Sequence, residues 1–200
     1  MHVGDEEAAD DHRVAGRLAQ EAGDLLLAVR DEGLAAGWDP WRLQAEGDRQ
    51  AHEHLAGRLA RLRPDDAVLS EEGDDDGFRL DAERTWIVDP LDGTRDYGRP
   101  GSIEWAVHVA LVVEGWPVAA AVALPASGAL FGTGTSPIGR TAERGRPVVV
   151  TSRSQWGEAE QVAGAIGGVV RSFGSAGVKA MAVVSGRADV YVHPSGLYEW

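Results

Sequence analysis

The first third of the chain carries apolar residues at helical spacing. One set predicts an amphipathic helix over about residues 6–33: Val14, Leu18, Ala22, Leu25, Leu26 and Val29. After a loop at residues 37–40, a second set predicts a helix that ends at Pro64: Ala51, Leu55, Leu59 and Leu62. Asp48 lies at or just before the first turn of this second helix, where an acid is favoured as a cap.

Shorter apolar runs follow and predict strands. The runs at residues 67–69 and 86–88 flank an acidic segment, residues 73–85, which reads as an exposed loop. Three β-rich runs come next, at residues 105–113, 118–124 and 130–133. Because Gly-Trp-Pro and Pro-Ala-Ser-Gly separate them as hairpin connections, we expect an antiparallel meander packed on the two helices, an α+β layer.

The last quarter of the chain alternates between strand and helix patterns. Residues 134–147 are rich in Gly, Pro and Arg and read as a linker. Strands are expected at residues 148–150, near 169–170 and at 190–192, with helices near 155–166 and 177–185. This alternation is typical of an α/β unit with at least partly parallel pairing. We therefore expect an α+β domain over residues 1–146 and a partial α/β domain over residues 147–200.

Composition narrows the function. The 200 residues hold no Cys and carry a formal net charge of −13. The charge argues against nucleic-acid partners, and no apolar run reaches the length of a membrane span. The absence of Cys fits a reducing cytoplasm. An anionic substrate would require metal ions to offset the negative field locally.

The run Trp-Ile-Val-Asp-Pro-Leu-Asp-Gly-Thr at residues 86–94 carries the chemistry. Pro90 ends the strand at Asp89 in a rigid turn that aims the Asp89 and Asp92 carboxylates at one point. Carboxylate oxygens on a stiff frame suit Mg²⁺, Gly93 allows a ligand close to the backbone, and Thr94 adds a hydroxyl. A solvated loop is the alternative for two such acids. Their place directly after a buried-looking strand favours a metal-dependent phosphatase.

Other acids and histidines accompany this motif. Glu71 and Glu72 form a second acidic pair just after the 67–69 run. His52 and His54 are not spaced as an HExxH metal motif and are expected on a solvated helix face. His108 alternates within a strand, which favours a structural role over a catalytic one.

Several motifs together resemble a known family. In chain order they are Asp48, Glu71-Glu72, the DPLDGT run at residues 89–94 and Gly174-Ser175-Ala176. The chain resembles the inositol monophosphatase superfamily, and within it the bacterial 3'(2'),5'-bisphosphate nucleotidases, from about residue 10 onward. Four sequence segments carry the resemblance: PDDAVLSEEG, WIVDPLDGTRDYG, WAVHVALVVEG and ADVYVHPSGLYEW. The resemblance implies a layered α/β/α/β sandwich with two or three Mg²⁺ ions at a junction of layers.

The resemblance also implies roles for single residues. Glu71, Asp89 and the Leu91 carbonyl would hold the first ion, and Asp89 and Asp92 the second. Two such ions can activate the attacking water and stabilise the leaving oxygen at once. By the same likeness, the residues that orient this water are Asp48 and Thr94. The alternative for Asp48 is a helix N-cap.

Substrate-binding residues are implied in the same way. The amides of Gly93 and Thr94 would receive phosphate oxygens. The loop Gly174-Ser175-Ala176 would face the substrate, with a plain helix-start loop as the alternative. Lys179 would meet a second phosphate, with a surface lysine as the alternative.

The expected reaction is hydrolysis of the 3'-phosphate of adenosine 3',5'-bisphosphate, giving AMP and phosphate. The alternatives are a phosphatase for inositol phosphate or fructose bisphosphate, and an inactive, truncated remnant. The last of these arises because the family's Trp-Asp motif would place an acid after Trp200, where the sequence stops. The resemblance also implies a homodimer.

Overall fold

The computed structural model describes residues 3–73, 77–134 and 145–193. The chain forms two compact units that divide between Thr135 and Ser136. The expected linker, residues 134–147, lies largely outside the described residues, as do the acids at 74–76 and the segment 194–200 that includes Trp200. The domain boundary after residue 146 therefore stays a prediction.

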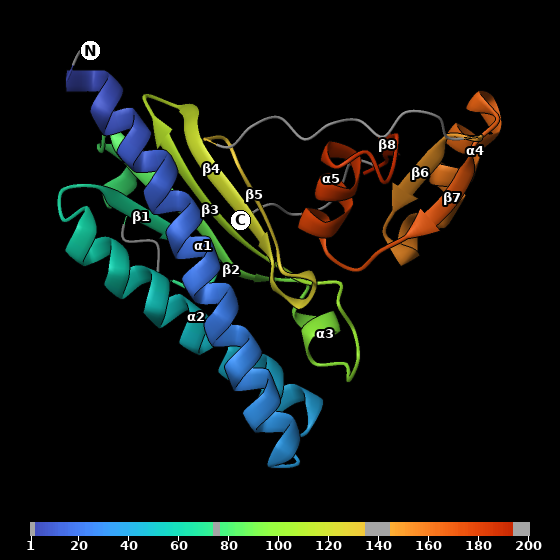
Figure 1. The fold of residues 1–200 in the computed structure, drawn as a ribbon, viewed down its shortest axis with the longest axis horizontal. Coiled ribbons are helices and arrows are strands. Elements are labelled where there is room, and N and C mark those ends of the chain that lie inside the picture. Colours follow the sequence, from blue (N-terminus) through green and yellow to red (C-terminus); the bar gives the residue numbers. More distant parts are fainter. Residues whose placement is uncertain (1–2, 74–76, 135–144, 194–200) are drawn as a thin grey trace. The chain divides into compact units, whose positions relative to one another are not determined.

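The first unit is built on a five-stranded sheet (Figure 1). Its strands, in spatial as well as chain order, are β1 (Ala67–Ser70), β2 (Arg84–Asp92), β3 (Ala106–Val113), β4 (Trp116–Leu124) and β5 (Ala129–Gly132). β1 runs parallel to β2, and the other neighbours are antiparallel. The antiparallel meander is confirmed. One detail of the expected connections is wrong, because Trp116 and Pro117 belong to β4. The turn itself falls at Glu114 and Gly115, whose φ angles of 49° and 80° suit a two-residue hairpin loop.

Two long helices cover one face of this sheet (Figure 1). They are α1 (Val3–Ala35) and α2 (Pro40–Leu62), which confirms both predicted helices. Alternate residues of the central strands point at the helices and are buried, among them Trp86, Val109 and Ala121. The apolar faces of the helices and of the strands, which repeat every 3.6 and every 2 residues, therefore form one core.

The start of α2 lies earlier than the sequence indicated. Asp39 caps the helix, since its carboxylate accepts a hydrogen bond from the Arg42 N–H at 2.9 Å, and Pro40 occupies the first turn. Asp48 therefore lies more than two turns inside α2. The alternative interpretation of Asp48 as an N-cap is wrong, and its carboxylate is available for another purpose.

Ion pairs join both helices to the sheet. The Asp11 carboxylate, buried on α1, lies 3.0 Å from Arg63 after α2 and 3.0 Å from Arg84 on β2. Arg84 also pairs with Asp66 at 2.9 Å, and Asp66 accepts the Trp86 indole N–H at 2.8 Å. A buried charge needs a partner, and here Asp11 on α1 pairs both with Arg63 after α2 and with Arg84 on β2.

β2 continues past the point where the sequence suggested that it ends. It runs through Pro90 to Asp92, and three positions along β2 correspond to two along β3, from the Asp89–His108 pair to the Asp92–Ala106 pair. Such a bulge tolerates Pro, which has no N–H for the ladder. Gly93, with φ of 89°, then turns the chain into the short helix α3 (Thr94–Tyr97).

The described residues also form three short 3₁₀ turns: η1 (Phe78–Leu80), η2 (Pro125–Ser127) and η3 (Arg153–Gln155). The first of them lies in the segment expected to be a loop, residues 73–85. The acidic residues at 74–76 that suggested this loop lie outside the described residues.

The second unit is a small parallel α/β layer. Its strands β6 (Val148–Thr151), β7 (Val169–Ser172) and β8 (Val190–Tyr191) lie in the order β7-β6-β8, all parallel. α4 (Trp156–Ile166) packs against Val149, whereas α5 (Ala176–Val184) packs against Val148 and Val150. Because successive residues of a strand point to opposite faces, the two helices cover opposite sides of the sheet. The predicted parallel α/β pattern is confirmed.

A glycine on α2 allows the helix to lie close to the α3 turn. A Cβ added at Gly47 would meet Tyr97 Cε1 at 2.6 Å and Leu91 Cδ2 at 3.1 Å. We predict that Gly47→Ala lowers the free energy of unfolding by about 1–3 kcal/mol, because overpacking outweighs the better helix propensity of Ala. Urea unfolding monitored by circular dichroism measures this effect.

Gly57→Ala on the same helix is the matched control. A Cβ there would meet only the end of the Arg61 side chain at 3.8 Å. It should stabilise the protein by up to about 1 kcal/mol through propensity alone. If both variants gained stability, the close approach at Gly47 would not constrain the fold.

Candidate metal centre and active site

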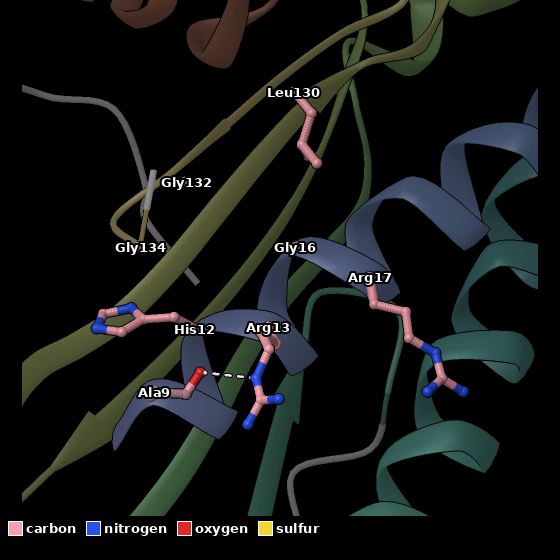
Figure 2. Close-up of a pocket in the computed structure, with 8 residues that line it drawn as sticks. All are labelled: Ala9, His12, Arg13, Gly16, Arg17, Leu130, Gly132 and Gly134. Carbon is pink, nitrogen blue, oxygen red and sulfur yellow. Dashed lines mark hydrogen bonds between the residues drawn. The ribbon is translucent and has the colours of Figure 1, made fainter. Parts of the chain in front are cut away.

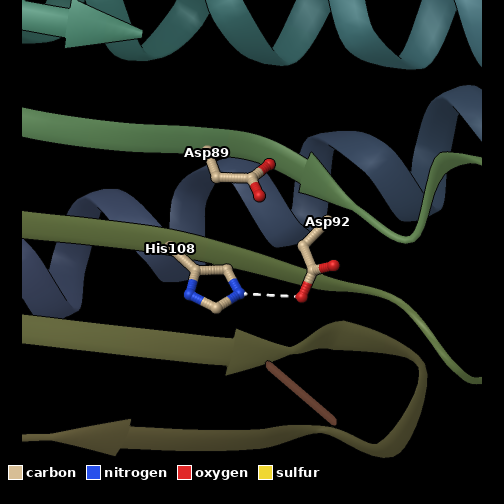
Figure 3. A group of neighbouring side chains, drawn as sticks. All are labelled: Asp89, Asp92 and His108. Atoms are coloured by element: carbon tan, nitrogen blue, oxygen red, sulfur yellow. Dashed lines mark hydrogen bonds and ion pairs between the residues drawn. The ribbon is translucent and has the colours of Figure 1, made fainter. Parts of the chain in front are cut away.

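Two aspartates at the end of β2 and a histidine on β3 form the centre of the site (Figure 3). Asp89, Asp92 and His108 each offer a ligand atom, and these atoms lie within 4.8 Å of one another. His108 stands opposite Asp89 in the strand register. The bulge at Pro90 brings Asp92 to the same side, where its Oδ2 lies 3.0 Å from His108 Nε2.

Glu71 joins this group through strand pairing. It follows β1, the parallel neighbour of β2, and its N–H donates to the Val88 carbonyl at 3.3 Å. Glu71 therefore emerges beside Asp89, and the two carboxyl groups share a hydrogen bond. The parallel strands β1 and β2 thus each contribute a carboxylate, Glu71 and Asp89, at the same end of the sheet.

Hydrogen bonds at the end of β2 connect Asp89 to α2. The Leu91 N–H donates to Asp89 Oδ1 at 3.1 Å, an Asx turn that fixes the carboxylate. The Leu91 carbonyl lies 3.0 Å from Thr94 Oγ1, which also lies 3.4 Å from Asp48 Oδ1. The structure therefore brings together six residues expected in the site: Asp48, Glu71, Asp89, Leu91, Asp92 and Thr94.

Burial and mutual repulsion raise the pKa values of these acids. Burial, followed by the charge of Asp92, raises the pKa of Asp89 to about 8. Burial, followed by the charge of Glu72, raises the pKa of Asp48 to about 7. Burial also raises the pKa of Glu71. Carboxylates held this close favour a cation among them, and their oxygens with the Leu91 carbonyl are the donors that Mg²⁺ prefers.

His108 is the residue of the site that sequence reasoning missed. The prediction gave it a structural role, whereas the structure places it against Asp92. Burial lowers its pKa, but the hydrogen bond and charge of Asp92 outweigh this and leave the pKa of His108 raised. The alternation with buried Val107 and Val109 does put His108 on the far face of the sheet from the helices. The register against Asp89 is what the sequence does not reveal.

Two other histidines are less solvated than expected. His52 Nδ1 lies 2.8 Å from Ser70 Oγ, and His54 Nε2 lies 3.3 Å from a Glu21 carboxylate oxygen. Both are half-buried between α2 and its neighbours. The prediction of a solvated face is wrong for these residues.

The loop expected to face the substrate lies in the second unit, before α5. Ser175 is the N-cap of α5, because its Oγ accepts a hydrogen bond from the Val178 N–H at 3.0 Å, and Ala176 begins the helix. The Ser175 side chain is fully buried. Gly174, Ser175 and Ala176 thus form a capped helix start, and their contact with a substrate stays a prediction.

Lys179 is not a surface lysine. Its side chain is buried, with a residue exposure of 2%. The ammonium group lies 3.0 Å from Ser152 Oγ and 3.3 Å from the Gly174 carbonyl, and it faces the Tyr191 ring at 5.4 Å. A buried cation held against the 173–174 loop argues for a specific role, since burying an ammonium group is costly.

A cavity in the first unit lies apart from the carboxylates (Figure 2). It has a volume of about 400 Å³ and lies between α1 and β5. Its lining includes none of the acids Asp48, Glu71, Asp89 and Asp92. Its two arginines are paired along α1, Arg13 with Asp10 at 3.2 Å and Arg17 with Glu21 at 2.8 Å. Its His12 lies 2.7 Å from Thr133 Oγ1. The cavity therefore shows neither free charge nor the chemistry of the carboxylate site.

Comparison with known proteins decides the family. The model of the inositol monophosphatase family matches residues 12–200. The chain belongs to the inositol monophosphatase family. The enzyme class expected from the sequence, a metal-dependent phosphatase, is confirmed.

Relatives within this family differ in what their names say they act on. A Mycobacterium tuberculosis protein named 3'-phosphoadenosine 5'-phosphate phosphatase is 45% identical over 191 residues, covering 90% of this chain and 70% of that protein. A Mycobacterium bovis inositol-1-monophosphatase is 32% identical over 214 residues, covering 94% and 72%. The relative named for a phosphorylated nucleotide is thus more similar than the one named for an inositol phosphate.

A solved structure bears out the fold class. CysQ from Bacteroides thetaiotaomicron superposes with a TM-score of 0.73 at 25% identity and covers 91% of this chain and 79% of its own. The mixed α/β fold class of the inositol monophosphatase family is therefore confirmed. Among the helices that the structure describes, none has the length and apolar content needed to cross a membrane.

The raised pKa values predict how the metal-free protein responds to pH. Asp89 has a pKa of about 8 when folded against a usual value of 3.8, so between these values the folded state binds more protons than the unfolded state. The free energy of unfolding contributed by this group therefore falls as pH rises from about 4 to about 8. Asp89→Asn removes the titration. In EDTA, the thermal midpoint of the variant should rise relative to that of the wild type between pH 5 and pH 8.5.

Asp65→Asn, at an exposed position, is the control for the loss of one negative charge. Its midpoint should stay parallel to that of the wild type over the same range. If the thermal midpoint of Asp89→Asn instead fell relative to that of the wild type as pH rises, the raised pKa of Asp89 would be contradicted.

Proposed function

We propose that this protein is a Mg²⁺-dependent phosphomonoesterase that hydrolyses the 3'-phosphate of adenosine 3',5'-bisphosphate to AMP and phosphate. The observation that carries the proposal is the meeting of Glu71, Asp89 and Asp92 beside the Thr94–Asp48 pair. The choice of substrate rests on the 45% identical relative, whose name specifies a 3'-phosphoadenosine 5'-phosphate. The proposal thus combines a site that suits phosphate chemistry with a likeness that suits a nucleotide.

Mg²⁺ fits the residues present. The first ion would be held by Glu71, Asp89 and the Leu91 carbonyl, and the second by Asp89 and Asp92. All of these donors are oxygens, and burial, followed by neighbouring negative charges, raises the pKa values of Glu71 and Asp89, which favours a cation at this place. When bound, the ions supply Lewis-acid stabilisation of the phosphoryl group and the leaving oxygen.

Asp48 and Thr94 are suited to handle the water. The pKa of Asp48, about 7, lies where a general base works near neutral pH. We propose that the Thr94 hydroxyl orients the water and that Asp48 takes its proton as the water oxygen bonds to phosphorus. The bond from phosphorus to the 3'-oxygen breaks, and that oxygen leaves with a proton from solvent. Phosphate and AMP are the products.

Backbone and cationic groups would bind the substrate. At the start of α3, the N–H groups of Asp96 and Tyr97 donate to the Gly93 carbonyl. We propose that the preceding amides, of Gly93 and Thr94, receive phosphate oxygens.

The loop before α5 has the same proposed task. Gly174, Ser175 and Ala176 stay proposed substrate-binding residues, and Lys179 is proposed to serve a second phosphate. A homodimer and a cytoplasmic location remain predictions from the sequence.

A comparison of substrates tests the proposal. We expect kcat/KM for adenosine 3',5'-bisphosphate to exceed the values for inositol 1-phosphate and fructose 1,6-bisphosphate by at least about tenfold, because a site built for two separated phosphates loses binding when one is missing or misplaced. Phosphate release at saturating Mg²⁺ measures all three. A preference for inositol 1-phosphate would favour the second candidate, which the 32% identical inositol-1-monophosphatase supports. Bound metal without turnover of any of the three would contradict the proposed activity.

Asp89→Asn tests the metal assignment. The residue would help to hold both ions, and an amide supplies neither the charge nor a second anionic oxygen. We predict that kcat/KM falls by about 10³-fold, equivalent to about 4 kcal/mol of transition-state stabilisation. The control, Asp65→Asn, should keep wild-type activity. Retention of most of kcat by Asp89→Asn at saturating Mg²⁺ would show that the assignment is wrong.

A further inference from the structure

The contact between His108 and Asp92 is not explained by the metal ligands alone. His108 Nε2 lies 3.0 Å from Asp92 Oδ2, and the two residues come from neighbouring strands, sixteen positions apart in the chain. In Figure 3 the imidazole points along the sheet at one oxygen of Asp92, while the other oxygen points away from the ring. The contact therefore distinguishes between the two oxygens of one carboxylate.

We propose that His108 is a positioning residue for Asp92, a proposal that rests on the metal-dependent function given above. The Nε2–H donates to Oδ2 and stops the carboxylate from rotating about its own axis. Asp92 would then offer the same oxygen to a bound cation. His108 itself stays outside the ligand set.

The hydrogen bond decides between this role and direct ligation. A ring nitrogen that carries a proton toward Asp92 has no lone pair to offer to a cation. An ionised carboxylate can only accept a hydrogen bond, so with Asp92 ionised we assign the proton to Nε2. Mg²⁺ also prefers oxygen to imidazole nitrogen. His108 therefore acts through Asp92.

The frame around His108 is rigid enough for this task. β3 is hydrogen-bonded to β2 on one side and to β4 on the other, and His108 pairs with Asp89 and with Val122. Its neighbours Val107 and Val109 are fully buried under the helices. The ring is thus anchored in the centre of the sheet, whereas Asp92 sits just after a bulge, where the ladder is interrupted. His108 on the regular strand β3 therefore orients Asp92 at the bulge of β2.

Calorimetric titration of the full chain with Mg²⁺ and with Mn²⁺ tests the proposal. His108→Ala removes the donor and should weaken the affinity for each ion by about 10- to 100-fold, the usual cost of losing a partner of a metal ligand. His108→Gln keeps an N–H donor at a similar reach and should recover most of the loss. His12→Ala removes a histidine that hydrogen-bonds Thr133 in the same unit and should leave both affinities unchanged.

The outcomes separate this inference from the proposed function. Equal affinities for wild type and His108→Ala would overturn the positioning role while leaving the metal site intact. If neither wild type nor variant bound Mg²⁺ or Mn²⁺, the proposed function itself would fail.

A ligand role for His108 has its own signature. It would make His108→Gln as weak as His108→Ala, and the electron spin echo of the Mn²⁺-loaded wild type would show a directly bound nitrogen. Either result would overturn the positioning role. Recovery by Gln, together with the absence of that nitrogen signal, is what the hydrogen bond predicts.

Discussion

The repulsion among carboxylates at the end of β2 is the constraint on which the rest of the site depends. Parallel pairing of β1 with β2 brings Glu71 to Asp89, and the bulge at Pro90 adds Asp92. Acids at such distances would separate on flexible loops. Here they sit on a sheet whose core is closed by two long helices and whose strand β2 is tied to α1 through Arg84 and Asp11. The fold therefore supplies the rigidity that keeps like charges together.

Aromatic packing holds α3, the short helix that follows β2, against α1. Tyr97 at the end of α3 donates its hydroxyl to the Leu26 carbonyl of α1 at 2.9 Å and packs edge-to-face on Trp105. Arg30 lies over both rings and donates to the carbonyls of Arg99 and Ser102, at 2.5 and 2.8 Å. The peptide groups that follow Thr94 are thus held by α1. Gly47 completes the arrangement, because only a residue without a side chain lets α2, with Asp48, approach Tyr97 this closely.

Much of this could be predicted from the sequence, for reasons that are local. The helices, the meander and the parallel α/β unit follow from apolar periods of 3.6 and 2, which depend on neighbours along the chain. The gathering of Glu71, Asp89 and Thr94 was expected through a family likeness. The start of α2 was missed because its cap, Asp39, precedes a turn of mixed polarity before the apolar period begins. His108 was missed because its importance depends on register across two strands, which no local pattern encodes.

The same carboxylates that suit the protein to bind metal also reduce its stability without metal. An acid whose pKa rises on folding opposes the folded state at neutral pH, and Asp89 and Asp48 both do so. A cation that binds only the folded arrangement offsets this cost by mass action, in proportion to the logarithm of its concentration over its dissociation constant. Any residue that sharpens the geometry of the ligands therefore contributes twice, once to catalysis and once to folding in the presence of metal. On this argument a donor to Asp92 belongs on β3, the strand with hydrogen-bonded neighbours on both sides that lies nearest to the bulge.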